Sequence, residues 1–215
     1  IEHLVKRAEK VGLSAFALVY YDNLIAAVRF SQAAKKHTLR PIYGAELTLH
    51  DDHHLLLLVK NADGWRNLCI LITKAQHAAK KGEARLPKDA LEGHTEGLIA
   101  LSAGRDGAIT ASLLSGDMKA ARATGKYYVN LFGKENFWVE LNHHHLHNDK
   151  ELIEQHVQLA KQLGVGYAAT NNVYFAEAEG YGLQNVLTAI KNNSTLEDTR
   201  HLRLPSREHY LKCNR

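Results

Sequence analysis

The sequence predicts an α/β fold with a mostly parallel sheet. Apolar runs of about five to eight residues alternate with amphipathic stretches of about 10 to 16 residues, which is the pattern of repeated strand–helix–strand units. A chain of 215 residues, of which 45% are hydrophobic and 23% charged, can bury one sizeable core. It has three prolines and no low-complexity tract, so we expect a single domain over residues 1–215 without a linker.

The first third of the chain is predicted to hold two helices and three strands. Residues 2–11 form an apolar stripe that stops at Gly12, which is typical of a helix closed by a left-handed glycine. A second helix is expected to begin at Asn23, whose side chain can cap it, and to run to about residue 37. Strands are expected over 14–20, 40–49 and 54–60. The inner faces of the two helices are predicted to carry Leu4, Val5, Ala8, Val11, Ala27, Val28, Phe30, Ala33 and Ala34.

The rest of the chain continues the alternation. Strands are expected over 97–103, 136–142 and 165–172, and helices over 64–79, 107–115, 117–132, 149–164 and 180–193. Asn148 is placed to cap the helix that Gly164 stops, and a short turn is expected near the end of the tail. An open doubly wound sheet and a closed barrel both fit this order. In either fold, functional groups gather where strands end, which is where Glu46 and the runs 140–147 and 170–174 lie.

Composition narrows the environment of the protein. No window approaches the roughly 18 apolar residues of a membrane span, and the chain does not open on a signal peptide, so we expect a cytoplasmic protein without a membrane partner. Cys69 and Cys213 lie far apart and suit reduced, incidental thiols. The net charge of +4 is compatible with work near DNA without indicating it. Two basic groups could touch DNA but are interpreted as solvated helix ends: Lys35, Lys36 and Arg40, and Lys80, Lys81 and Arg85.

Histidines cluster in two places. In ELNHHHLHND, residues 140–149, alternation along a strand puts Glu140, Asn142 and His144 on one face and His143 on the other, so the histidines cannot all bind one ion. We interpret this stretch as a polar strand end that leads to the next helix, with a residual metal site as the alternative. The second cluster, HDDHH at 50–54, could chelate a metal through its histidines, and a solvated turn is the favoured interpretation.

The order of these segments resembles the polymerase-and-histidinol-phosphatase (PHP) domain, the module at the amino terminus of bacterial DNA polymerase III alpha subunits. The resemblance spans nearly the whole chain, and LQNVLTAI and SREHYLK are similar to the error-prone paralogues. It implies a distorted seven-stranded (β/α) barrel of TIM-like form, here without its first strand, with a metal cluster where the strands end. The segments that carry the resemblance are IEHLVKRAEKVGLSAFAL, DNLIAAVRFSQAAKK, PIYGAEL, HLLLLVKNADGWRNLC, EGLIALSAG, SLLSGDMKAA, LFGKENFWVEL, LGVGYAATNNVYF, QNVLTAI and REHYLK.

The metal ligands that the resemblance implies are largely replaced. The His-x-His pair that opens intact members has no counterpart, and their Thr-Asp-His-Gly-Asn-Leu is here the run 19–24, which puts Tyr20 and Tyr21 at two ligand positions. Their Thr-Asn-Asp-Val-His becomes 170–174, which puts Asn172 and Tyr174 at two more. Glu46 of the Gly-x-Glu motif and the ligand histidine, here His144, are retained. A phenol with a pKa near 10 and a neutral amide are poor ligands at neutral pH.

Two functional hypotheses follow from this ligand loss. The first is a PHP module without phosphoesterase activity that serves a polymerase as a scaffold, with residues 200–215 leading toward the polymerase region. It would pack on the polymerase domains of its own chain, hold a proofreading or accessory subunit, meet DNA only through the parent enzyme, and need no cofactor. The second is a metal-dependent phosphoesterase, either a 3′–5′ exonuclease or a pyrophosphatase. It would use zinc or manganese at Glu46 and His144 with additional ligands such as His143 or His145.

Overall fold

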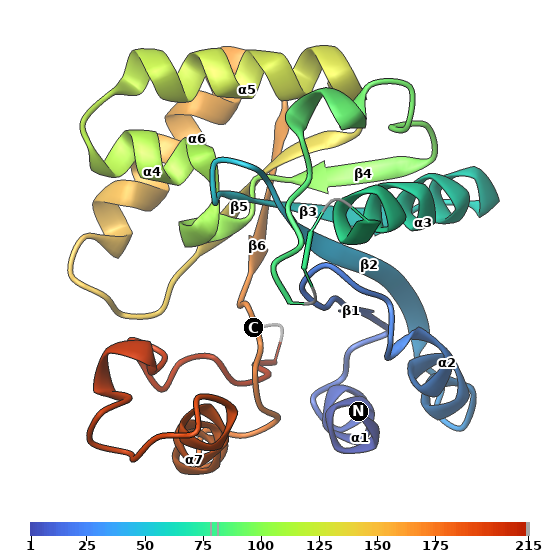
Figure 1. The fold of residues 1–215 in the computed structure, drawn as a ribbon, viewed down its shortest axis with the longest axis vertical. Helices are drawn as coiled ribbons and strands as arrows, with labels where there is room; N and C mark the ends of the chain where they lie inside the picture. The colour runs from blue at the N-terminus through green and yellow to red at the C-terminus, as the bar shows by residue number, and fades with distance from the viewer. Residues whose placement is uncertain (78, 81, 214–215) are drawn as a thin grey trace.

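The described strands form one curled sheet in which each strand pairs with the next along the chain. The structure, a computed structural model, describes residues 1–77, 79–80 and 82–213. Its sheet order is β1-β2-β3-β4-β5-β6, and no pairing closes β6 onto β1 within the described residues. The sheet is therefore a half-barrel wall (Figure 1). Its strands are β1 (Ala15–Leu18), β2 (Arg40–Thr48), β3 (His54–Val59), β4 (Leu98–Leu101), β5 (Phe137–Asn142) and β6 (Gly166–Thr170).

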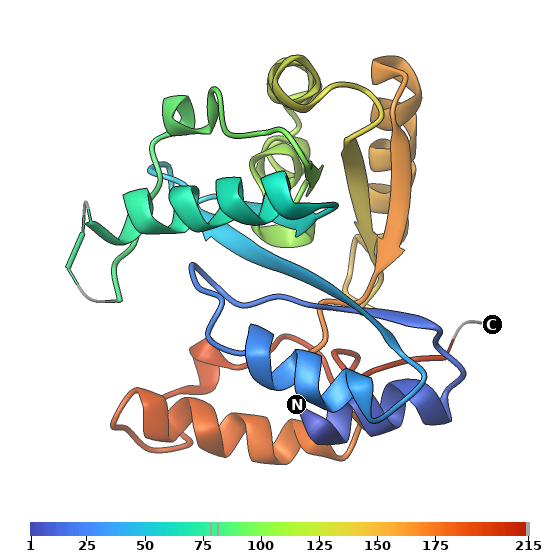
Figure 2. The ribbon, with the colours of Figure 1, turned by 90° about the vertical axis from the view of Figure 1, so that its right-hand side faces the viewer.

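The sheet is mostly parallel, as expected, with one reversed strand. Strands β1 and β2, β4 and β5, and β5 and β6 pair in parallel, whereas β3 is antiparallel to both of its neighbours. The reversal follows from the short polar connection before His54, because the Leu49 N–H donates to the His53 carbonyl at 2.8 Å and closes a hairpin. Figure 2 shows the resulting curl, with β5 and β6 upright and β2 crossing beneath them.

Seven helices are described, and four of them cover the outer side of the curl. Leucine, phenylalanine and tyrosine side chains from α3 to α6 pack with the buried residues of β2 to β5 in one core, and Tyr128, Phe137 and Leu57 are almost fully buried there. Each such leucine contributes roughly 2 kcal/mol of gross hydrophobic stabilisation. The helices are α1 (Glu2–Lys10), α2 (Ala27–Lys35), α3 (Ala62–His77), α4 (Ala108–Leu114), α5 (Met118–Phe132), α6 (Asp149–Leu163) and α7 (Gly180–Lys191).

A second, smaller core joins the two ends of the chain. Val5 of α1 and Phe30 of α2 pack with Leu211 from the carboxyl-terminal segment, and the rings of Phe16 and Phe30 meet edge-on at 5.8 Å. The carboxyl-terminal segment is also tied to the loop after β6, because the Asn171 side-chain amide donates to the Glu208 and Tyr210 carbonyls. The tail therefore stabilises both edges of the open sheet.

The predicted elements are confirmed in type and order, with three local corrections. Asn23 does not cap α2, because its Oδ1 accepts from the Ile25 N–H and the helix starts later, after Ala26. Asn148 stands at the predicted N-cap position, just before α6, but makes no side-chain capping bond. Val28 was expected on the inner side of α2 and is 71% exposed instead. The predicted end of α3 near residue 79 abuts residue 78, which lies outside the described residues.

Within the described residues, no helix is long and apolar enough to cross a membrane, as expected from the sequence.

Candidate functional site

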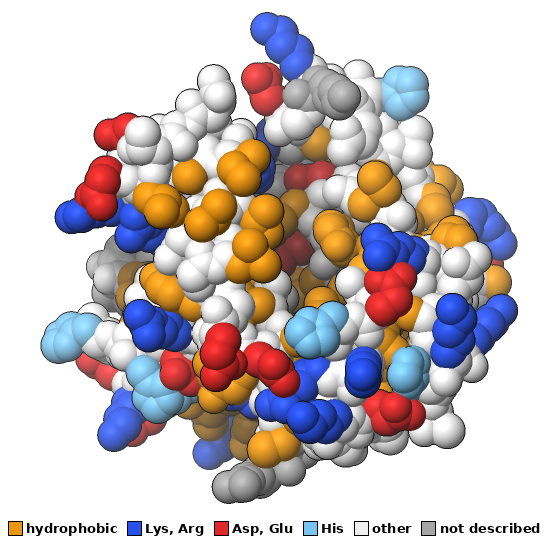
Figure 3. Space-filling view, turned by 90° about the horizontal axis from the view of Figure 1, so that it is seen from below, with side chains coloured by type: hydrophobic (Ala, Val, Ile, Leu, Met, Phe, Trp, Pro, Cys, Tyr) orange, Lys and Arg blue, Asp and Glu red, His pale blue; other side chains and the backbone are white. Residues whose placement is uncertain are grey.

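The polar side chains of interest lie at one end of the sheet, where β1, β2, β5 and β6 end and β3 begins. In Figure 1 the carboxyl ends of β5 and β6 point downward, and Figure 3 views the molecule from that side. Figure 3 shows a central hollow with acidic side chains inside it and hydrophobic side chains around it. The predicted location of functional groups at the carboxyl ends of the strands is therefore the hollowed face of the fold.

Glu46 anchors this site from β2. Its backbone is fixed on both sides, because its N–H donates to the Tyr20 carbonyl at 3.0 Å and its carbonyl accepts from the Asp22 N–H at 3.0 Å. Its carboxylate is buried and lies 2.8 Å from Nδ1 of His54, the first residue of β3. Burial raises the pKa of Glu46, while the His54 bond opposes that rise. Burial acts to lower the pKa of His54, and the bond to Glu46 outweighs it and raises that pKa.

Asp106 completes a three-residue group with Glu46 and His54. One ligand atom from each of the three lies within 4.8 Å of the others. Asp106 is exposed and comes from the short turn Gly104–Asp106 that follows β4. Gly104 makes this turn possible, since its φ is +49° and a Cβ at that position would overlap Oδ1 of Asn142. Among the described residues, this is the one His, Cys, Asp and Glu group with metal-ligand spacing, and His144 is not part of it.

Two tyrosines meet across the site. The hydroxyl oxygens of Tyr21 and Tyr174 lie 2.8 Å apart, and the ring of Tyr21 meets the ring of His54 edge-on at 5.2 Å. Tyr21 also pairs with Glu46 through an isolated parallel bridge. Burial and the nearby Glu46 carboxylate raise the pKa of Tyr21, and burial raises that of Tyr174. Both phenols therefore stay protonated at neutral pH and form a neutral hydrogen-bonded pair.

Glu140 is a second buried carboxylate, on β5. Its side chain accepts from the Thr170 hydroxyl, and its backbone N–H donates to the Ser102 hydroxyl at 2.9 Å. Burial raises the pKa of Glu140 to about 7, although the bond from Thr170 opposes that rise. Asn142, two residues on, donates to the same Thr170 hydroxyl at 2.7 Å. Glu140 is therefore committed to a buried network between β5 and β6.

His144 lies at the side of the hollow and is occupied by protein partners. The side chain is 3% exposed, its Nε2 lies 3.0 Å from the Asn171 carbonyl oxygen, and its ring stacks on His209 at 3.9 Å. Burial lowers the pKa values of both histidines. Asn172 has φ +40°, a left-handed conformation that asparagine tolerates, and its carbonyl oxygen lies 3.0 Å from His209 Nδ1. These two predicted positions thus hold the carboxyl-terminal segment in place.

Asp149 fixes the loop that carries His144. Its carboxylate accepts from the backbone N–H groups of His144 at 2.7 Å and Leu146 at 2.9 Å, and it pairs with Arg105 at 2.5 Å. The pKa of Asp149 is lowered because the Arg105 guanidinium and these N–H groups outweigh the opposing effect of burial. The polar residue that organises the start of α6 is therefore Asp149, in place of the expected Asn148.

The interpretation of the histidine cluster in residues 140–149 holds throughout, whereas that of the cluster in residues 50–54 holds only in part. His144 is buried while His145 and His147 are exposed, in agreement with a polar strand end rather than a shared ion site. In HDDHH, His50, Asp51 and Asp52 are exposed as a solvated turn requires. His54 begins β3, in line with the strand expected over 54–60, and only its assignment to the solvated turn is wrong, because its imidazole lies against Glu46. Alternation from the apolar residues of β3 could have identified His54, since it shares a face with Leu56 and Leu58.

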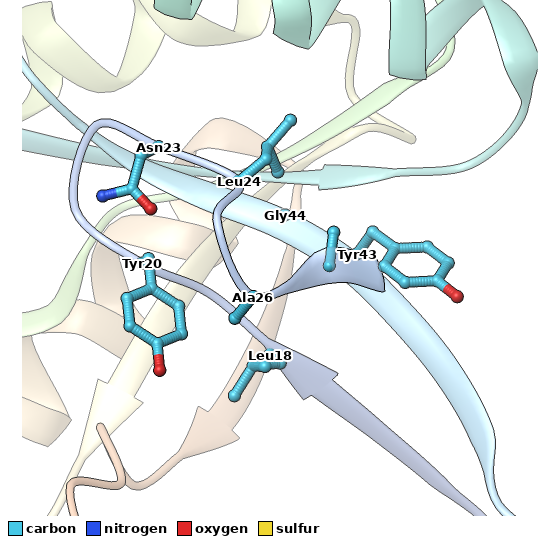
Figure 4. Close-up of a pocket in the computed structure, with 8 residues that line it drawn as sticks. Leu18, Tyr20, Asn23, Leu24, Ala26, Tyr43 and Gly44 are labelled. Atoms are coloured by element: carbon cyan, nitrogen blue, oxygen red, sulfur yellow. The ribbon is translucent and has the colours of Figure 1, made fainter. Parts of the chain in front are cut away.

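Tyr20 stands apart from the other replaced ligand positions. It is 41% exposed and borders a small pocket of ≈ 10 Å³ between the end of β1 and the start of α2, room for about one water molecule. Figure 4 shows its ring beside Leu18 and Ala26, on the opposite side of the loop from Leu24. Two residues further on, the Asp22 carboxylate accepts hydrogen bonds from the Thr48 N–H at 2.8 Å and from the Thr48 hydroxyl at 2.7 Å. The Asp22 carboxylate is therefore engaged with Thr48, although its charge still acts on nearby Glu46 and His54.

The donor set does not fit a cluster of two or three metal ions. Tyr21 and Tyr174 bond to each other, Glu140 bonds to Thr170, and His144 lies against the Asn171 carbonyl. Glu46, His54 and Asp106 remain, which suits one hard or borderline ion at most. The sequence named His54 only as a possible chelator within HDDHH and did not point to Asp106, although Asp106 follows a buried strand, where functional positions are expected.

The basic residues considered for DNA contact remain a prediction. Lys35, Lys36 and Arg40 are exposed near the end of α2 and the start of β2. Arg85 donates to Asp52 at 2.7 Å, and Lys80 is exposed. Lys81 lies outside the described residues.

Known proteins resemble this chain along its whole length. A model of the PHP domain family matches residues 1–144. The chain is 30% identical to the DNA polymerase III subunit alpha of Treponema pallidum, covering 100% of this chain and 20% of that protein. It is 32% identical to the same subunit of Pseudomonas aeruginosa, over 99% of this chain and 19% of that protein. It is also 32% identical to the error-prone DNA polymerase of Symbiobacterium thermophilum, over 99% and 21%.

Among solved structures, a protein of Bifidobacterium adolescentis assigned as a metal-dependent phosphoesterase superposes with a TM-score of 0.49 and 13% identity, covering 80% of each chain. The chain spans about a fifth of the length of the curated polymerases that it matches.

Proposed function

Because the chain belongs to the PHP domain family, we propose that it is the PHP module of a bacterial DNA polymerase III of the alpha or error-prone type, and that it works as a structural and interaction module. Nucleotidyl transfer would then be carried out by carboxylates of a palm domain outside this sequence. The chain covers 20% and 19% of the length of two of these polymerases, which supports its role as one module of a longer polypeptide.

The hydrogen bond between Tyr21 and Tyr174 is the observation that carries this proposal. The two residues stand at positions where the family resemblance implies metal ligands. A protonated phenol offers a weak neutral oxygen, and each of these two is already engaged with the other. The bond instead links the loop after β1 to the loop after β6, which supports a structural use of the former ligand positions.

The expected partners follow from the same proposal. The module would contact the polymerase domains of its own chain, and a proofreading or accessory subunit is a further candidate. The module would come close to DNA only through the polymerase of which it is a part, and it would act in the cytoplasm. The two carboxylates of the site, Glu46 and Asp106, disfavour direct binding of a phosphate backbone there.

Metal content and hydrolysis test the proposal. We expect the purified protein, after dialysis against zinc or manganese and gel filtration, to retain less than one tightly bound ion. We also expect no release of nucleotides from a 3′-labelled oligonucleotide and no phosphate from pyrophosphate. Stoichiometric metal together with hydrolysis that disappears in Glu46→Gln would refute it. Asp63→Asn, a change at an exposed carboxylate on α3, is the matched control.

A second candidate function rests on the group formed by Glu46, His54 and Asp106. It is a phosphoesterase, a 3′–5′ exonuclease or a pyrophosphatase, with one zinc or manganese ion. When bound, such an ion supplies an acidified water and charge stabilisation. Glu46 and His54 would hold it from the rigid strands β2 and β3, and Asp106 from the turn after β4. This candidate predicts that Asp106→Asn abolishes both ion retention and hydrolysis, whereas His144→Ala preserves ion retention because His144 lies outside the group.

A further inference from the structure

Helix α7 has its hydrophobic side facing outward. Four aliphatic side chains on it are exposed: Leu183 by 64%, Val186 by 40%, Leu187 by 50% and Ile190 by 68%. We call these four residues the α7 stripe. The polar residues Gln184, Asn185 and Thr188 are half-buried on the other side, and Ala189 is the one fully buried residue of the helix. This is the reverse of an amphipathic helix packed on its own domain.

The inner side of α7 is held by polar and aromatic contacts with the segments that precede and follow it in the chain. The Tyr181 hydroxyl donates to the Leu204 carbonyl at 3.1 Å, the Arg207 guanidinium lies over the Tyr181 ring, and Phe175 meets that ring edge-on. Figures 1 and 2 show α7 at the bottom of the molecule, away from the sheet. These contacts fix the direction of the helix, so the exposure of the α7 stripe is built into the fold.

The α7 stripe has the spacing of a helix-packing seam. Val186, Leu187 and Ile190 follow Leu183 by three, four and seven residues, which places the four side chains on one face along about two turns of the helix. Figure 3 shows hydrophobic side chains gathered over this part of the face, beside the central hollow. Such a stripe is used by helices that lie against another apolar surface.

We propose that the α7 stripe is the docking surface for the polymerase portion of the same polypeptide. This inference rests on the proposed function, because it assumes that the chain is one module of a polymerase. The curated relatives are about five times as long as this chain, so a tethered neighbour is available in each of them. Tethering gives an effective concentration near the millimolar range, so a modest apolar contact is enough to keep the two portions docked.

Charge and area argue against other occupants. α7 carries one charged residue, Lys191, whereas DNA and anionic membranes are bound by clusters of cations. A free dimer needs about 800 Å² of buried surface from each partner, and a stripe of four aliphatic side chains on a 12-residue helix offers less. An apolar surface of the tethered polymerase portion needs neither a cluster of cations on α7 nor a large buried area, because the tether already holds it close.

Site-specific photo-crosslinking in the full encoded polypeptide tests this proposal. A benzophenone amino acid replaces Leu187 on α7, and the same residue replaces Leu114 on α4 as a control, since Leu114 is 51% exposed and lies outside the stripe. The expected result is an intramolecular crosslink from position 187 to a peptide of the polymerase portion, at least about tenfold above that from position 114. Leu187→Asp combined with Ile190→Asp is expected to lower the melting temperature of the full polypeptide by about 3 °C or more.

Each contrary result overturns a distinct claim. Crosslinks between two copies, with a dimer that Leu187→Asp dissolves, assign the stripe to a second copy and overturn the docking proposal. Equal crosslinking yields from positions 187 and 114, with an unchanged melting temperature when Leu187→Asp is combined with Ile190→Asp, also overturn it. If the full encoded polypeptide contains no polymerase region, the proposed function itself is refuted. These outcomes separate failure of the docking surface from failure of the function.

Discussion

The hydroxyl oxygens of Tyr21 and Tyr174 lie 2.8 Å apart, although 153 residues separate them in the chain. The bond joins the loop after β1 to the loop after β6, and these two strands are the edges of the described sheet. A metal cluster at these positions would hold the same loops together through ionic ligands. In this protein, two neutral phenols supply that connection, and the bond between them requires no ion.

Removing either hydroxyl should weaken this connection. Tyr21→Phe and Tyr174→Phe are each expected to lower the free energy of unfolding by about 0.5 to 1 kcal/mol, because each removes the hydroxyl–hydroxyl bond at a site that water partly reaches. The double variant should cost less than the sum of the two singles, with a coupling energy of at least about 0.5 kcal/mol in a double-mutant cycle. Urea unfolding measures all three. Tyr167→Phe, at an exposed tyrosine on β6, is the control, and additive singles would contradict the pairing.

Glu140 should make stability depend on pH. Its pKa of about 7 in the folded protein lies above the ordinary value of 4.5, so the folded state holds this proton more tightly than the unfolded state does. The contribution of Glu140 is therefore most favourable below pH 4.5 and is lost as the pH rises through 7. Glu140→Gln should raise the free energy of unfolding by up to about 3 kcal/mol at pH 8.5 and change it little at pH 4.5. Equal effects at the two pH values, in urea unfolding, would argue against a protonated Glu140.

The opposite pH dependence is expected of Asp149. Its lowered pKa means that the pair with Arg105 stabilises the folded state above the ordinary value of 3.8, and this stability is lost as the pH falls below it. Asp149→Asn should lower the free energy of unfolding by about 2 to 4 kcal/mol at pH 7, because it removes a buried ion pair and weakens two bonds to backbone N–H groups.

The control for Asp149 is another aspartate paired with an arginine. Asp63→Asn breaks the exposed pair with Arg66 and should cost less than about 0.5 kcal/mol. The difference between the two variants should shrink at pH 3. A difference that persists unchanged at pH 3 would mean that Asp149 acts through packing rather than charge.

Leu211 should matter more than its place near the end of the chain suggests. It is 5% exposed and packs with Val5 and Phe30 in the smaller core. Leu211→Ala is expected to lower the free energy of unfolding by about 2 to 4 kcal/mol, because it opens a cavity where the tail joins α1 and α2. Leu202→Ala, at a half-exposed leucine, should change it by less than about 0.5 kcal/mol. Similar unfolding curves for the two variants would exclude a structural role of the tail.

The strands and helices could be predicted because each has a local signal. Apolar runs identified β3 and β4, and the glycine stop at Gly164 identified the end of α6. The direction of β3 had a signal in the length of its connection, because the few residues between the strands predicted over 40–49 and 54–60 are too short for a parallel crossover and require a hairpin. The outward orientation of the hydrophobic side of α7, by contrast, could not be predicted, because periodicity shows that a helix has a hydrophobic side without showing whether that side is buried.

The candidate site was predicted in part. The family resemblance placed Glu46 and the tyrosines at one end of the sheet, and the structure brings Glu46, Tyr21 and Tyr174 together there. His54 and Asp106 were not predicted as partners of Glu46, because the three residues come from separate elements and their distances depend on the curl of the sheet. His144 stayed a predicted ligand position, yet its neighbours are Asn171 and His209.

Restoring ligand chemistry should restore ion binding if the side chains, and not the fold, prevent it. In the triple variant Tyr21→His, Asn172→Asp and Tyr174→His, each change returns the residue type that the resemblance implies, next to the unchanged group of Glu46, His54 and Asp106. Because an ion that binds only the folded state raises its stability in proportion to the logarithm of ion concentration over Kd, the melting temperature of the variant should rise steadily with added zinc. The parent protein should rise less at every concentration, and Tyr167→His, on the exposed side of β6, should behave like the parent. A triple variant that folds but responds to zinc no more than the parent would mean that the geometry of the half-barrel, rather than ligand identity, keeps the site without a cluster.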